Sequence, residues 1–226
     1  MRKIYQKAII MLSVACMGYA TPAFAADAVV KTNKAWLSGA THIYGRMTVS
    51  GITSSNIKEK GFCYSSVNQM PTVEDGTSKI YLSNQGEIYN ISQLKPATVY
   101  YIRAYVKKTN GDVVYGDPVK AITRPKGGVT YNINDGFPSD ALTRVLSAAK
   151  EAIDLWNEYT GIHGLHITIN YGAQTQTADC SYGGWMRIGP NASYQKTGTL
   201  LHEMLHAIGV GTHGTWQNSF LRSNTT

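Results

Sequence analysis

The sequence predicts a multidomain protein in which an all-β sandwich is followed by an α+β domain. Between Val29 and Thr123, short runs of β-branched and aromatic residues are broken by Gly, Asn, Ser and Pro, the layout of an antiparallel sandwich. Beyond Gly128, strand patterns alternate with helical patterns. The chain has 226 residues, of which 43% are hydrophobic, so two small folded domains are possible and a disordered chain is not expected.

Residues 1–25 have the pattern of a secretory signal peptide. Three basic residues in the first ten positions precede a hydrophobic run from Ala8 to Ala20, and Ala23-Phe24-Ala25 forms a small-residue cleavage site. No later stretch of about 18 apolar residues follows, so we expect no membrane span in the mature chain. The predicted location is secreted, at the cell surface or periplasmic, after cleavage near Ala25.

The net charge of +7 is unevenly distributed. Residues 26–125 contain 12 basic and 7 acidic side chains, whereas residues 126–226 contain 6 basic and 7 acidic ones. The basic residues of the first segment are scattered, with Lys107-Lys108 as the only adjacent pair. Such a pattern indicates a solvated surface and argues against a nucleic-acid partner.

Two cysteines follow the signal peptide, Cys63 and Cys180, one on each side of the boundary expected near Pro125. Export would permit a disulfide between them. Two separate buried thiols fit the sequence equally well, and the choice stays open at this point.

The clearest strand of the first segment runs from Val99 to Val106, with Tyr100 and Ile102 among the residues of one face. Asn110-Gly111 predicts a tight hairpin turn, followed by a return strand over 113–115. The run from Leu94 to Tyr105 resembles the L-x-P-x-T-x-Y-x-x-R-A-x stretch of fibronectin type III domains.

That resemblance implies a fibronectin type III-like β-sandwich over residues 26–125, in which the hydroxyl of Tyr100 returns to the backbone upstream. It implies a spacer or adhesion module without catalytic residues. A surface polymer is a possible partner of its tyrosine-rich surface.

The second segment, residues 126–226, is expected to contain an alternating series of strands and helices. The predicted elements are a strand over 129–133, a helix from Pro138 to the stop at Gly161, a strand over 165–171, an extended piece over 185–188 and a helix from about Thr197 to Ile208. The apolar face of the first helix is predicted to contain Leu142, Val145, Leu146, Ala149, Ile153 and Trp156.

The last predicted helix contains His202-Glu203-Met204-Leu205-His206, the H-E-x-x-H arrangement of zinc peptidases. Residues four apart lie above one another on a helix, so both imidazoles can reach one zinc ion. Glu203 would then take a proton from the water that the zinc activates. In a chain with 6 histidines and 6 glutamates this pattern arises by chance with a probability of about 0.004.

The motif continues to Gly209 and His213 and so resembles the metzincin pattern H-E-x-x-H-x-x-G-x-x-H. The resemblance implies a zincin-like metallopeptidase domain in which the chain turns at Gly209 and a third histidine binds zinc. His213 stands one residue later than the family pattern requires, and Gly211 would allow the longer loop. The alternatives for the third ligand are His166 and a group outside this chain.

Metzincins also have a methionine-containing turn and a closing helix after the third histidine. Only 13 residues follow His213, and none is Met, so this is either a minimal relative or a domain truncated at its C-terminal end, and the polar residues 222–226 favour truncation. In the same family an antiparallel edge strand pairs with extended peptide, and Trp185–Ile188 is the candidate by analogy. An ordinary edge strand is the equal alternative.

The sequence thus predicts a secreted zinc-dependent metalloendopeptidase with Glu203 as general base, His202, His206 and His213 as metal ligands, Zn²⁺ as cofactor and a protein or peptide as substrate. The alternative is a non-catalytic secreted or surface adhesion protein with a metal-binding domain.

Overall fold

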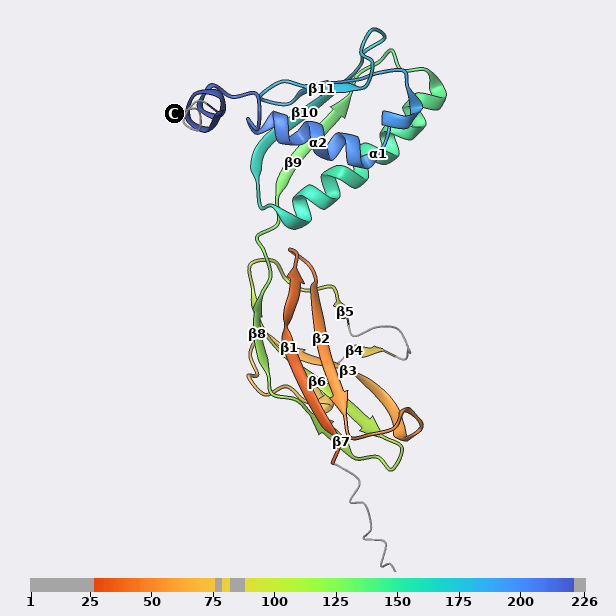
Figure 1. Ribbon diagram of the computed structural model, residues 1–226, viewed down its shortest axis with the longest axis vertical. Coiled ribbons are helices and arrows are strands. Elements are labelled where there is room, and N and C mark those ends of the chain that lie inside the picture. The colour runs from red at the N-terminus through yellow and green to blue at the C-terminus, as the bar shows by residue number, and fades with distance from the viewer. Residues whose placement is uncertain (1–26, 76–78, 82–87, 222–226) are drawn as a thin grey trace, which may run out of the picture.

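The structure is a computed structural model that describes residues 27–75, 79–81 and 88–221. The predicted signal peptide, residues 1–25, lies outside the described residues. Figure 1 shows a β-sandwich and an α/β unit placed end to end along the long axis of the molecule.

The sandwich consists of two antiparallel sheets. The first has the order β1 (Val29–Ser38), β2 (Ile43–Ser50), β5 (Ile88–Ile91). The second has the order β4 (Lys79–Tyr81), β3 (Ile57–Ser65), β6 (Val99–Lys108), β7 (Val113–Tyr115), and β8 (Val119–Ile122) also pairs with β6. Short 3₁₀ turns, η1 (Ser54–Asn56) and η2 (Val73–Asp75), precede β3 and β4.

Strand β6 confirms the predicted strand and hairpin. Tyr100 and Ile102 point into the core of the sandwich, and the return strand β7 covers the predicted residues. The backbone N–H of Lys95 donates a 2.9 Å hydrogen bond to the hydroxyl oxygen of Tyr100. The predicted return of the Tyr100 hydroxyl to upstream backbone is therefore confirmed.

The α/β unit begins with β9 (Gly128–Ile133), α1 (Ser139–Tyr159) and β10 (His163–Tyr171). It continues with β11 (Ala178–Cys180), β12 (Trp185–Ile188), η3 (Ala192–Tyr194), α2 (Thr197–Ala207) and the π-helix η4 (Trp216–Leu221). The sheet order is β11-β12-β10-β9, with β10 parallel to both of its neighbours and β11 antiparallel to β12. The predicted elements of this segment are confirmed.

The prediction that Trp185–Ile188 forms an antiparallel edge strand is wrong. These residues form β12, which lies inside the sheet and runs parallel to β10, with Thr168 opposite Trp185. The chain reverses through Gly183 and Gly184, whose φ angles of 93° and 98° favour glycine, so β11 and not β12 becomes the edge.

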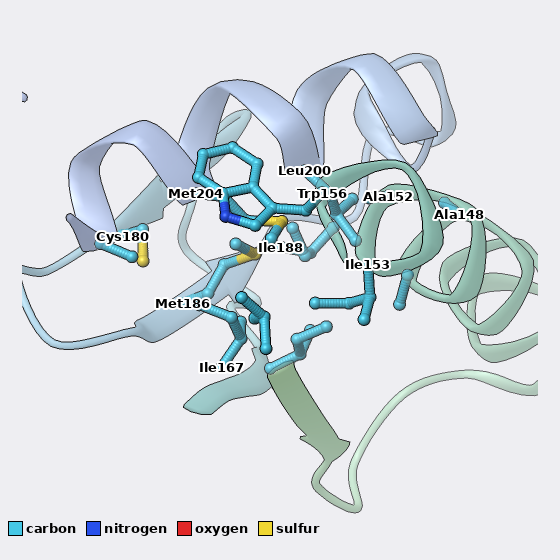
Figure 2. Packing of buried hydrophobic residues seen from close by; sticks show 14 of the residues in the cluster. Ala148, Ala152, Ile153, Trp156, Ile167, Cys180, Met186, Ile188, Leu200 and Met204 are labelled. Atoms are coloured by element: carbon cyan, nitrogen blue, oxygen red, sulfur yellow. The ribbon is translucent and has the colours of Figure 1, made fainter. Parts of the chain in front are cut away.

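Both helices pack on one face of this sheet, and their apolar side chains form its core (Figure 2). Trp156 and Ile153 of α1 meet Leu200 and Met204 of α2 above the sheet side chain Met186. The predicted helix face is only partly correct. Leu146 is 47% exposed, and small side chains, Ala141, Ala148 and Ala152, are buried in the helix instead.

The two units meet at the C-terminal end of α1. The Glu158 carboxylate accepts hydrogen bonds from the backbone N–H of Thr41, at 2.6 Å, and from Nδ1 of His42, at 2.8 Å. Nε2 of His42 lies 2.7 Å from the Tyr159 hydroxyl oxygen. The Ala40 N–H also donates to the backbone carbonyl of Glu158. We call these contacts the joint.

The cysteines are two separate free thiols. Cys63 is buried in the sandwich and Cys180 in the α/β unit, which decides between the alternatives that the sequence left open. Burial raises the pKa of each thiol to about 12. Within the described ranges, no helix is both long and apolar enough to cross a membrane.

Candidate active site

Helix α2 has two imidazoles on one side and buried apolar residues on the other. Leu200 and Met204 are buried in the core, whereas His202 is exposed and His206 half-buried. The centroids of the two imidazole rings are 5.0 Å apart, with the ring planes at 88°. The helical spacing of four residues therefore brings these predicted ligands together.

The turn after α2 orients His206. The chain leaves the helix at Gly209, whose φ is 104°, as predicted. Nδ1 of His206 lies 2.7 Å from the carbonyl oxygen of Val210. A carbonyl can only accept, so Nδ1 carries the proton and the lone pair of Nε2 stays available to a metal ion.

Glu203, the predicted general base, lies between these histidines in the sequence but is 6% exposed. Burial raises the pKa of its carboxyl group, and the charges of His206 and His202 oppose that shift. The side chain has no hydrogen-bond partner in the part of the chain that the structure describes. A carboxylate in this setting takes up a proton closer to neutral pH than an exposed one.

A pocket of about 370 Å³ lies beside His202 and Glu203. It is lined by Thr177, Tyr194, Lys196, Gly198, Thr199, His202 and Glu203. Contacts to α1 hold the segment that leads into α2. Arg144 Nε donates to the buried Gln195 side chain at 2.8 Å, and the Thr197 hydroxyl donates to Glu151 at 2.6 Å. The wall of the pocket is thus braced by α1.

The structure does not bring His213 to the imidazole pair. Its backbone N–H donates to the Gly209 carbonyl at 3.0 Å. The ring packs on Tyr182, with centroids 4.7 Å apart, in a second pocket that also contains Trp216. His213 as third ligand therefore stays a prediction.

His166, the alternative ligand, lies on the other face of the sheet. Its neighbours Ile167 and Ile169 point toward the helices, so His166 points away from them. Nδ1 lies 2.8 Å from the Thr130 hydroxyl, and Nε2 lies 2.8 Å from the side-chain oxygen of Asn132. Both ring nitrogens are engaged, and the sheet separates them from α2.

The residues fit a zinc ion in part. Two imidazoles one helical turn apart, one of them fixed as the suitable tautomer, match two ligands of a zinc site. Zinc sites take three or four protein ligands, and the described residues contain no group of three or more His, Cys, Asp or Glu side chains placed to hold a metal ion.

Sequence reasoning missed the pocket wall formed by Thr177, Tyr194 and Lys196. The predicted start of α2 near Thr197 was the available signal for Lys196. Thr177 directly precedes the edge strand β11 and lines the pocket because β11 packs beside α2. No local sequence pattern predicts this contact between β11 and α2.

No protein-family model matches the chain, and no curated protein matches it. Among solved structures, the chain is similar to the 6th fibronectin type III domain of human fibronectin type III domain containing protein 3. The identity is 22% over 48% of this chain and 88% of that chain, and the TM-score is 0.31.

It is also similar to the fibronectin type III domain of human contactin 1, with 16% identity over 56% of this chain and 98% of that one and a TM-score of 0.31. A third match is the sensor domain of the anti-sigma factor RsgI4 of Pseudobacteroides cellulosolvens, with 16% identity over 43% of this chain and 94% of that one and a TM-score of 0.31.

Proposed function

We propose that the chain is a secreted zinc-dependent metallopeptidase whose residues 126–226 form a zincin-like domain. The supporting observation is the pair His202 and His206, with Nδ1 of His206 bonded to the Val210 carbonyl and Nε2 left free. His202 and Glu203 both line the pocket, which leaves room for a substrate beside the pair. The antiparallel edge strand β11, beside the site, agrees with the family resemblance.

In this proposal His202 and His206 hold the zinc ion. Zinc, when bound, acts as a Lewis acid on a peptide carbonyl. Glu203 accepts a proton from the attacking water and returns it to the leaving amine. Burial raises the pKa of Glu203, which makes it a stronger base toward water than an exposed glutamate.

A third protein ligand requires a rearrangement. His213 can join the pair only after its ring leaves Tyr182. The positive φ angles of Gly209 and Gly211, 104° and 75°, place two glycines in the connecting turn, where a change of backbone conformation costs little. Zinc should therefore bind His213→Ala at least about tenfold more weakly than the parent chain.

The test combines zinc stoichiometry with hydrolysis of a fluorescently labelled unfolded protein. We expect one zinc per chain, and we expect Glu203→Gln to keep the zinc and lose at least about 100-fold in hydrolysis rate. Glu74→Gln, on the exposed η2 turn of the sandwich, is the matched control and should change neither. Hydrolysis retained in Glu203→Gln, or a folded chain that takes up no zinc, would overturn the proposal.

A second candidate is a non-catalytic secreted or surface binding protein that keeps a metal site. It is favoured by the position of His213 against Tyr182, which leaves two imidazoles at the site. In that case zinc binds His202 and His206 but no peptide is cleaved, and the sandwich supplies the binding function. Zinc uptake without hydrolysis separates this candidate from the first.

A further inference from the structure

The pocket beside His202 and Glu203 contains an unpaired positive charge. Lys196 is exposed, lines the pocket and has no ion-pair partner among the residues that the structure describes. Three other cations of this unit are paired: Arg144 with Asp140, Lys150 with Asp154 and Arg187 with Asp179. Lys196 is therefore available to an external anion.

The start of α2 adds a second attraction for anions at the same place. The first turn places Gly198 and Thr199 in the pocket wall. Within the described residues no side chain caps this helix, and its first turn contains no acidic residue. The first N–H groups of a helix have no partner within it and give that end a partial positive charge. A Cβ atom at Gly198 would meet nothing within 4 Å, so a ligand can approach closely.

A second observation at the pocket is an acceptor group without a partner in the described part of the chain. Glu203, 6% exposed, lines it without a hydrogen-bond partner among the described residues. A donor from outside the chain, such as a peptide N–H, would satisfy this acceptor.

We infer that this pocket binds an aspartate or glutamate side chain of a polypeptide substrate, with Lys196 and the first turn of α2 holding the carboxylate. This inference rests on the proposed function, and it names the substrate class of that site. The pocket has the size of known small-ligand sites. Of the described residues around it, one is a lysine and none is an arginine, which suits a single carboxylate better than a phosphate clamp.

The test measures binding of fluorescein-labelled peptides to the full chain in the Glu203→Gln background, which is expected not to cleave them. Two peptides are compared that differ only in one position, glutamate or glutamine. We expect the glutamate peptide to bind about tenfold more tightly than the glutamine peptide, and Lys196→Met to remove this difference. Lys196→Glu should reverse it in favour of a lysine peptide.

Lys120→Met, on β8 of the sandwich, is the matched control and should leave the discrimination intact. Equal binding of the glutamate and glutamine peptides, or discrimination that survives in Lys196→Met, overturns the inference. The two proposals can fail separately. Cleavage of both peptides at equal rates by the zinc-loaded parent chain rejects the acidic pocket and keeps the peptidase, whereas discrimination in binding without any cleavage keeps the pocket and rejects the peptidase.

Discussion

Two polar groups of the sandwich and two of the α/β unit make an instructive comparison. In the sandwich, the Tyr100 hydroxyl accepts from Lys95 N–H, and the Thr32 hydroxyl oxygen accepts from the N–H of Ala104, so both groups find partners within the same unit. In the α/β unit, the buried Glu203 and the start of α2 have no such partners among the described residues. Polar groups of the first kind help to hold the fold together, whereas those of the second kind are accessible to groups outside the chain.

The largest expected effect tests whether the units have separate cores. Phe62 is fully buried in the sandwich, with its ring 5.5 Å from that of Tyr89. Phe62→Ala should cost about 3–5 kcal/mol of unfolding free energy in urea, and Leu200→Ala in the other core about 2–5 kcal/mol. If the units are separate, Phe62→Ala leaves zinc affinity unchanged. Loss of zinc binding in still-folded Phe62→Ala would show that the cores are coupled.

The next largest expected effect is a loss of zinc affinity in the α/β unit. His206→Ala should weaken zinc binding by at least about 100-fold, because it removes the imidazole that the Val210 carbonyl orients. Isothermal titration with zinc measures this change. His166→Ala is the control, since that ring lies across the sheet and bonds to Thr130 and Asn132. An equal loss in both variants would contradict the assignment of the site to α2.

The buried thiols, one in each unit, predict a dependence of stability on pH. Burial raises the pKa of Cys63 and of Cys180 to about 12 in the folded chain. An unfolded thiol ionises from about pH 8.5, so ionisation favours the unfolded chain, and stability falls as the pH rises from about 8.5 toward 12.

Each thiol should contribute a loss of roughly 1–2 kcal/mol between pH 8 and pH 10. Urea unfolding at the two pH values, compared with Cys63→Ala and Cys180→Ala, isolates the contribution of each unit. Below pH 8 the pH dependence of stability should be the same in the parent chain and both variants. Identical curves above pH 9 would mean that the thiols are not buried as described.

The smallest effect concerns the hydrogen bond between Tyr100 and Lys95 in the sandwich. Tyr100→Phe removes the acceptor of the Lys95 N–H and should cost about 1 kcal/mol of unfolding free energy. Tyr101→Phe is the neighbouring control, because the Tyr101 hydroxyl has no partner among the described residues. Thermal unfolding of both variants measures the difference in stability. Equal unfolding midpoints in the two variants would show that the hydrogen bond between Lys95 and Tyr100 contributes nothing to stability.

Much of the fold was predictable because its signals are local. The alternation in β6 and the helical spacing in α1 and α2 report which residues share a face, and those elements appear where the sequence places them. The order of strands in the sheet is not a local property. For that reason β12 was assigned to the edge that β11 occupies. Leu146 was assigned to the core, although the close packing of α1 on α2 buries alanines instead.

The candidate site was predictable to the same extent. Helical geometry predicts that His202 and His206 lie side by side. The conformational freedom of glycine predicts the turn at Gly209. The position of His213 depends on contacts with Tyr182, which comes from the β11–β12 turn. Thr177 lines the same pocket as Lys196 but comes from the segment before β11, so spacing around α2 contains no information about it.

Helix α1 reaches from the joint to the pocket. Its last turn holds the sandwich through Glu158 and Tyr159, and Arg144 and Glu151 hold the residues that enter α2. Over its 21 residues the helix is about 30 Å long. It therefore connects the joint to the pocket as one rigid element. If the sandwich were anchored to a surface, α1 would hold the pocket in a fixed orientation relative to that surface. A force applied to the sandwich would then be transmitted to the pocket through this one helix.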